Sequence, residues 1–235
     1  MAGLDKFIWI IANWKSNKTI AEALEWVEKV GPNVSKGENL RIVVCPTFSC
    51  LSEIKKIIQV NNFPLMIGSQ DLSPFGVGAY TGEESAILLS DLIDLSIIGH
   101  SERRKNFHES DVMIAKKMQQ AMDNQVTPLL CVQSEETPVP DNATMIAYEP
   151  IWAISTGLTN TPGVGRADTP EDANKVAGFF KQKYGSKLEV IYGGSVNSQN
   201  VKGFITQANI NGVLVGNASL NALEFIKICK AVEKG

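Results

Sequence analysis

Two residue types that carry metal and redox chemistry are scarce in this sequence. Its 235 residues include only two histidines and four cysteines. The cysteines show neither a Cys-x-x-Cys spacing nor the framework of a small disulfide-bonded secreted protein, and the histidines lie far from them in the sequence. We therefore predict reduced, mostly buried cysteines and no metal site.

Excess positive charge and long apolar runs are also missing. Lys and Arg number 22 against 25 for Asp and Glu, so no basic surplus is available to bind a nucleic acid backbone. The longest apolar run near the N-terminus, residues 7–12, is far too short to span a bilayer and lacks the layout of a signal peptide. We expect a cytoplasmic protein with neither nucleic acid nor membrane as a partner.

The sequence instead alternates short β-branched runs with helix-like segments. Eight apolar runs are candidate strands, and most are continuous, as expected for strands covered on both faces by helices. They cover residues 7–13, 40–46, 65–71, 95–100, 127–132, 144–150, 189–195 and 212–217. Helix-like spacing of apolar residues occupies 21–30, 51–58, 85–93, 111–122 and 170–184.

This alternation predicts an α/β protein with a parallel sheet. Eight strands favour closure into a (β/α)₈ barrel that forms a single domain over residues 1–235, although a doubly wound open sheet fits the same pattern. Glu149 follows Cys131 by only 18 positions, which include two prolines, so the helix between strands five and six should be shortened or missing. The strand face exposed there would need a loop or a neighbouring subunit to cover it, which weakly favours assembly.

Polar residues follow several candidate strands at the edge where a barrel carries its active site. They are Asn13 and Lys15, His100 with Ser101 and Glu102, Glu149, Gly193 to Ser195, and Gly216 with Asn217. A candidate base, a cation and a glycine-rich phosphate cradle would therefore converge at one rim.

Each candidate also has a purely structural interpretation. Glu149 follows an apolar run, so desolvation would raise its pKa and suit a general base, but a rim ion pair fits the same position. His100 is either an electrophile or a satisfied structural group, with Ser101 and Glu102 supplying hydrogen bonds around it. Lys15 would hold an anionic substrate, while Trp14 beside it is expected to pack in the core.

Six segments, taken together, closely resemble the signature segments of the triosephosphate isomerase family, in the family's order. They are ANWKSN, GAYTGE, HSERR, AYEPIWAISTG, YGGSV and VGNASL. The resemblance implies interconversion of dihydroxyacetone phosphate and D-glyceraldehyde 3-phosphate through an enediolate, in glycolysis and gluconeogenesis, without a cofactor.

The resemblance also implies a role for each matching residue. Glu149 would move the proton, His100 would polarise the carbonyl as a neutral imidazole, Lys15 would supply positive charge and Asn13 would help to fix the substrate. The stretch after Glu149 would close as a lid. The phosphate contacts would come from Ser155, Ser195, Gly216 and Asn217, and the clamp on the base from Ile154 and Leu214.

A homodimer is implied by GAYTGE, which would place Thr81 near the partner's Lys15 and Glu83 opposite the partner's Arg103. The sequence departs from the family where Ser155 and Asn217 replace glycine, and in the extra residues 161–169. It departs again in the short segment after Cys131, where Gln133 and Ser134 replace Gly-Glu, and at Ser16, which replaces a larger interface residue. A tetramer is therefore an alternative to the dimer.

Two other functions fit part of the pattern. One is a different phosphosugar isomerase or synthase on the same barrel, against which AYEPIW and HSERR both count. The other is a phosphate-binding barrel that has lost catalysis, for which Ser155 and Asn217 are the only support.

Overall fold

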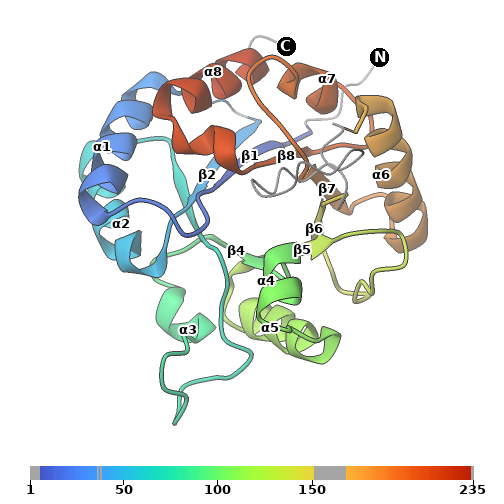
Figure 1. Cartoon of the computed structure of the whole chain (residues 1–235), viewed down its shortest axis with the longest axis horizontal. Helices are drawn as coiled ribbons and strands as arrows, with labels where there is room; N and C mark the ends of the chain where they lie inside the picture. Colours follow the sequence, from blue (N-terminus) through green and yellow to red (C-terminus); the bar gives the residue numbers. More distant parts are fainter. Residues whose placement is uncertain (1–5, 36, 38, 151–167, 234–235) are drawn as a thin grey trace.

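A computed structural model describes residues 6–35, 37, 39–150 and 168–233 (Figure 1). Eight parallel strands form a closed barrel in the order β1 to β8, with β8 pairing back to β1. The strands are β1 (Ile8–Asn13), β2 (Leu40–Cys45), β3 (Met66–Ser69), β4 (Leu95–Ile98), β5 (Thr127–Val132), β6 (Met145–Tyr148), β7 (Glu189–Tyr192) and β8 (Gly212–Val215). The predicted (β/α)₈ barrel is confirmed, and the open sheet is excluded.

Helices surround the barrel (Figure 1). They are α1 (Ile20–Val30), α2 (Leu51–Asn61), α3 (Ala86–Leu89), α4 (Ser101–Asn106), α5 (Asp111–Asp123), α6 (Pro170–Tyr184), α7 (Val201–Ile205) and α8 (Ala222–Glu233), with the 3-10 turns η1 (Gly31–Asn33), η2 (Phe48–Cys50) and η4 (Asn217–Leu220). The helix expected over 85–93 is wrong in length, because α3 ends at Leu89 and a turn follows. No helix long and apolar enough to cross a membrane occurs in the described residues.

The core has two layers, which explains the continuous apolar runs. One buried cluster consists only of strand residues and fills the barrel interior; Ile11, Cys131 and Ala147 belong to it. Their neighbours Ile10 and Ile146 point the other way and join a larger cluster between strands and helices. Because successive side chains of a strand alternate between faces and both faces are buried here, nearly every strand position is apolar.

Helix α1 shows how the outer layer supports the rim. It begins at a capping box in which Thr19 and Glu22 satisfy each other's backbone N–H groups, an arrangement typically worth about 1 kcal/mol. The buried Trp26 of α1 packs edge-on against Trp14, with the ring centroids 4.9 Å apart. The Nε1–H of Trp26 donates to the Ser219 carbonyl of η4 at 2.9 Å. One helix therefore braces the loops that follow both β1 and β8.

The connection between β5 and β6 lacks a helix, as predicted, because residues 133–144 form turns and irregular chain. Of the two covers expected for the strand face there, the chain's own residues supply one. The side chains of Leu130, Val132, Ile146 and Tyr148 are all at most 3% exposed and join the same cluster as Val139 of the connection. This gap therefore gives no support to assembly.

Candidate active site

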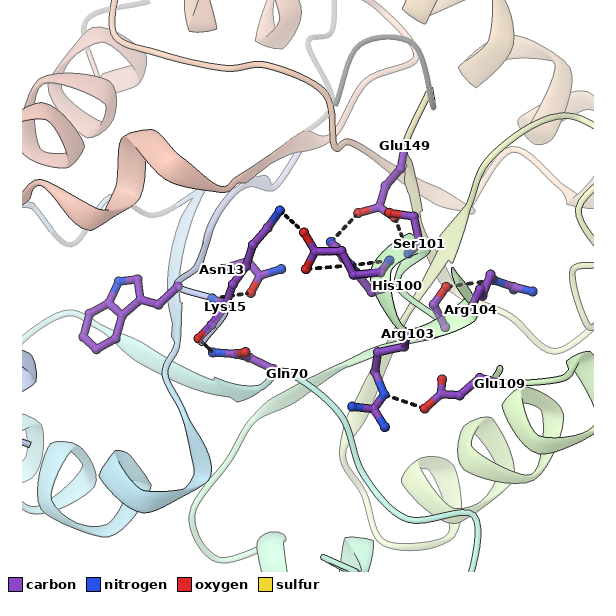
Figure 2. Close-up of polar contacts among 12 residues, drawn as sticks. Asn13, Lys15, Gln70, His100, Ser101, Arg103, Arg104, Glu109 and Glu149 are labelled. Atoms are coloured by element: carbon purple, nitrogen blue, oxygen red, sulfur yellow. Dashed lines mark hydrogen bonds and ion pairs between the residues drawn. The ribbon is translucent and has the colours of Figure 1, made fainter. Parts of the chain in front are cut away.

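Polar side chains from β1, β4 and β6 converge at the rim formed by the carboxyl ends of the strands (Figure 2). His100 Nε2 lies 2.9 Å from Glu149 Oε1, and the backbone N–H of Ser101 donates to Glu149 Oε2 at 3.1 Å. Lys15 Nζ forms an ion pair with Glu102. The catalytic candidates that the sequence places after three different strands are thus brought into one cluster.

Glu149 fits its position because its neighbour, the residue directly after β7, is a glycine. The carboxylate is almost fully buried, and its residue is only 1% exposed. A Cβ atom on Gly193 would lie 2.8 Å from Glu149 Cγ, closer than carbon atoms approach, and 3.2 Å from the Tyr148 carbonyl, which is a tight contact. The sequence suggested phosphate binding for the adjacent glycines Gly193 and Gly194. The geometry adds that Gly193 makes room for Glu149.

The pKa of Glu149 is shifted in the direction opposite to the one expected. Burial raises this pKa by desolvation, but His100, the Ser101 N–H and Lys15 outweigh it, so the net pKa lies below its ordinary value. The prediction of a raised pKa is therefore wrong for this arrangement. Glu149 is buried as foreseen. The fold also brings His100, the Ser101 N–H and the charge of Lys15 near its carboxylate, and these favour the ionised form.

His100 is held by contacts at both ring nitrogens. The Glu102 backbone N–H donates to Nδ1 at 3.2 Å, so in the neutral ring the proton lies on Nε2, which faces Glu149. Burial lowers the pKa of His100, but the carboxylates of Glu149 and Glu102 raise it above its ordinary value. Both contacts favour a proton on Nε2 and a negative charge on Glu149.

Lys15 has an unusual backbone. Its φ is 54°, in the left-handed region that non-glycine residues rarely adopt. Its N–H donates to Asn13 Oδ1 at 3.1 Å, so Asn13 helps to fix this conformation. Gln70, which follows β3 and was not singled out from the sequence, donates to the Lys15 carbonyl (Figure 2). A glutamine directly after a buried strand was the signal that could have identified it.

A pocket joins this cluster to the ends of β7 and β8. Ser195, Leu214, Gly216 and Asn217 all line it together with Asn13, Lys15, His100 and Glu149. The loop after β7 is already ordered: Asn200 Nδ2 donates to the Ser195 carbonyl at 3.0 Å, and the Ser198 N–H donates to Glu224 at 2.8 Å. Ser155 and Ile154 lie in 151–167, outside the described residues.

Two of the four residues assigned to a dimer interface, Ser16 and Arg103, line a second, smaller cavity. Ser16, Gln70, Arg103 and Phe107 help to line it beside Lys15. Thr81 and Glu83 are exposed on the segment between β3 and α3, which extends far from the barrel (Figure 1). Arg103 forms ion pairs within its own chain, with Asp71 at 2.8 Å and with Glu109.

The four cysteines are free and buried, as predicted. Among the described residues, no group of three or more His, Cys, Asp or Glu side chains is placed to hold a metal ion.

Comparisons with known proteins agree with this geometry. Residues 8–232 match the family model described as triosephosphate isomerase. A triosephosphate isomerase of Mesomycoplasma hyopneumoniae is 39% identical, covering 93% of this chain and 97% of its own. One of Dehalococcoides mccartyi is 35% identical and covers 95% of each chain. A crystal structure of triosephosphate isomerase from Bartonella henselae has a TM-score of 0.81 and 29% identity, covering 96% of this chain and 99% of that one. Since the family model spans nearly the whole barrel, this chain belongs to the triosephosphate isomerase family, a family of aldose–ketose isomerases.

Proposed function

We propose that this protein interconverts dihydroxyacetone phosphate and D-glyceraldehyde 3-phosphate through an enediolate, as a step of glycolysis and gluconeogenesis. The observation that carries the proposal is the pairing of a buried carboxylate, Glu149, with the imidazole of His100, 2.9 Å apart, in the pocket that Lys15 also lines. The names of the relatives support the same substrates.

In the proposed reaction, Glu149 takes a proton from the hydroxyl-bearing carbon next to the substrate carbonyl and returns it to the former carbonyl carbon. The hydroxyl proton passes to the former carbonyl oxygen by way of His100 Nε2. His100 donates from Nε2 to the oxygen that becomes negative, and the Lys15 ammonium stabilises the same charge. The phosphate would lie against the backbone N–H groups at Ser195, Gly216 and Asn217, where glycines allow close approach. No cofactor is required by this sequence of proton transfers.

The contact between His100 and Glu149 belongs to the ligand-free protein in this proposal. When Glu149 turns towards a bound substrate, the carboxylate that raises the pKa of His100 moves away. Burial, which lowers the pKa of His100, then dominates, and the Glu102 N–H at Nδ1 favours a neutral ring. A neutral imidazole with its proton on Nε2 is then the donor to the substrate.

A coupled assay of glyceraldehyde 3-phosphate isomerisation tests the proposal. We expect Glu149→Gln to lose about 10²- to 10⁴-fold in kcat, the usual contribution of a general base. Glu136→Gln, at an exposed position of the β5–β6 connection, is the matched control and should retain full activity. An inactive wild-type protein that still binds phosphoglycolate would contradict the proposal and favour a binding protein.

We also propose that the chain forms a homodimer through the segment between β3 and α3. Three large side chains of this segment, Phe75, Val77 and Tyr80, are 37–70% exposed. A second copy would bury them and bring Thr81 and Glu83 to the cavity beside the partner's Lys15 and the partner's Arg103. Light scattering should give the mass of two chains, and Tyr80→Asp should give the mass of one; four chains would instead support the tetramer.

We further propose that residues 1–235 act as one catalytic domain in the cytoplasm. The closed barrel already uses residues from Ile8 to Val215, and its core is continuous with α8. Four reduced cysteines suit a reducing compartment. Fluorescence of a tagged full-length protein in the source cell would test the location.

A further inference from the structure

We propose that Gln70 is a positioning residue for the isomerase reaction, because it holds the strained backbone of Lys15 and so directs the Lys15 ammonium into the active site. The inference rests on the proposed function for the role of that ammonium. The backbone geometry itself is independent of which substrate binds.

The backbone of Lys15 is strained, and so is that of Lys18 three residues later, where φ is 72°. A φ of 54° brings the Cβ of an L-amino acid close to its own backbone, so the residue relaxes to negative φ unless surrounding contacts prevent it. Residues held in this way cluster at functional sites because the strained backbone sends the side chain in a direction that relaxed chain does not allow. Lys15 therefore needs contacts that fix its peptide groups.

Three hydrogen bonds supply this restraint. The Lys15 carbonyl accepts from Gln70 Nε2 at 2.9 Å and from the Asn17 N–H at 3.0 Å, while the Lys15 N–H donates to Asn13 Oδ1 at 3.1 Å. Asn13 and Asn17 lie within two residues of Lys15 and can move with it. Gln70 is 55 positions away and follows β3, so among these three hydrogen bonds it is the one that ties the Lys15 backbone to another part of the barrel.

Gln70 is itself anchored. The same Nε2 donates to the Cys45 carbonyl at 3.0 Å, at the last residue of β2, and that carbonyl also accepts the Trp14 N–H at 3.2 Å. One amide nitrogen thus bridges the ends of β1 and β2 (Figure 2 shows its contact with Lys15). A side chain at this position must present two N–H groups from one atom, which glutamine does and an ionised glutamate or a methionine does not.

The ion pair with Glu102 cannot replace this restraint. It fixes the distance between Lys15 Nζ and the Glu102 carboxylate, which is about one-third exposed, and it holds no backbone atom of Lys15. Without Gln70, the backbone of Lys15 can relax to negative φ and carry the ammonium away from the substrate. A misplacement of about 1 Å costs up to about a hundredfold in rate.

A double-mutant cycle tests whether Gln70 acts through Lys15. Gln70→Met keeps the length of the side chain and removes both donors; we expect kcat/KM to fall about ten- to a hundredfold. In a Lys15→Met background, where the ammonium is already gone, the same change should cost less than about threefold, because coupled residues are not additive. Gln59→Met, at an exposed position of α2, is the matched control.

Equal losses in the two backgrounds, or activity of Gln70→Met within threefold of wild type, would overturn the inference. Thermal unfolding of each variant checks that it is folded. If Gln70→Met is not folded, Gln70→Glu, which keeps the shape of the glutamine side chain, replaces it. A crystal structure of the Gln70 variant gives a readout without activity: Lys15 should show a negative φ, and a φ still near 54° would also overturn the inference.

The two proposals can fail separately. If the wild-type protein shows no isomerase activity, the proposed function fails, and the same cycle is then measured as the affinity for phosphoglycolate. If the wild type is active and loses activity in Glu149→Gln but not in Gln70→Met, only the role of Gln70 fails.

Discussion

Replacing Gly193 with alanine should displace the Glu149 side chain without changing any residue of the proposed catalytic set. The added methyl group would lie 2.8 Å from Glu149 Cγ and 3.7 Å from Glu149 Oε1. Carbon atoms approach to about 3.5–4.0 Å, so either the glutamate or β7 must move by about 1 Å. The Tyr148 carbonyl, 3.2 Å from the methyl group, limits how far the strand can move.

The expected loss is therefore mainly in the rate of the chemical step. A displacement of about 1 Å corresponds to a fall in kcat of up to about a hundredfold, with a smaller change in KM because two of the three proposed phosphate contacts, Gly216 and Asn217, follow β8 instead. Overpacking should also lower stability by about 1–3 kcal/mol, which calorimetry would detect.

Gly178→Ala is the control for Gly193→Ala. It adds the same methyl group to α6, facing the end of the Asn209 side chain, and should keep wild-type kcat. A Gly193→Ala enzyme with kcat within threefold of wild type would refute the view that Glu149 works from the position described.

Three further predictions concern charge and backbone strain. In Glu149→Gln, burial should dominate at His100, so the imidazole pKa should fall below that of the wild type in an NMR titration; an unchanged pKa would contradict the coupling. Burial raises the pKa of Asp71 to about 6, despite its ion pair with Lys117. A folded-state pKa above the ordinary value means that the stability contribution is present at low pH and is lost as pH rises towards about 6. The free energy of unfolding of wild type should therefore fall relative to that of Asp71→Asn over this window, measured by urea titrations at several pH values. Gln125 has a φ of 61° at an exposed position after α5, and Gln125→Gly should raise stability by about 1 kcal/mol, measured as Tm.

The strands were predictable because their signal is local. Each of the eight apolar runs became a strand to within a few residues, since burial on both faces leaves a continuous pattern in a single short segment. The segment 85–93 was less predictable: its apolar residues have helical spacing, but the chain turns after Leu89. The sequence analysis interpreted the segment HSERR as polar residues at the rim of the barrel. In the structure this segment also begins α4, with His100 as the N-cap residue.

The identities of the rim residues were in the sequence, but their electrostatics were not. Burial of Glu149 could be inferred from the apolar residues before it. Its net pKa could not, because it is the balance between desolvation and the contacts made by His100, Ser101 and Lys15, which arrive from other strands. The two opposing effects depend on distances, and a sequence contains no distances.

By itself, then, the sequence determined the alternation of strands and helices, the missing helix after β5 and the residues at the rim, and it favoured a barrel over an open sheet; the structure decided the closure. Only the tertiary structure decided that Gly193 makes room for Glu149, that the strand face beside the missing helix is covered, and that Gln70 restrains Lys15. The physical reason is that periodic burial is written into neighbouring residues, whereas each of these contacts joins segments that meet only after the eight strands have closed.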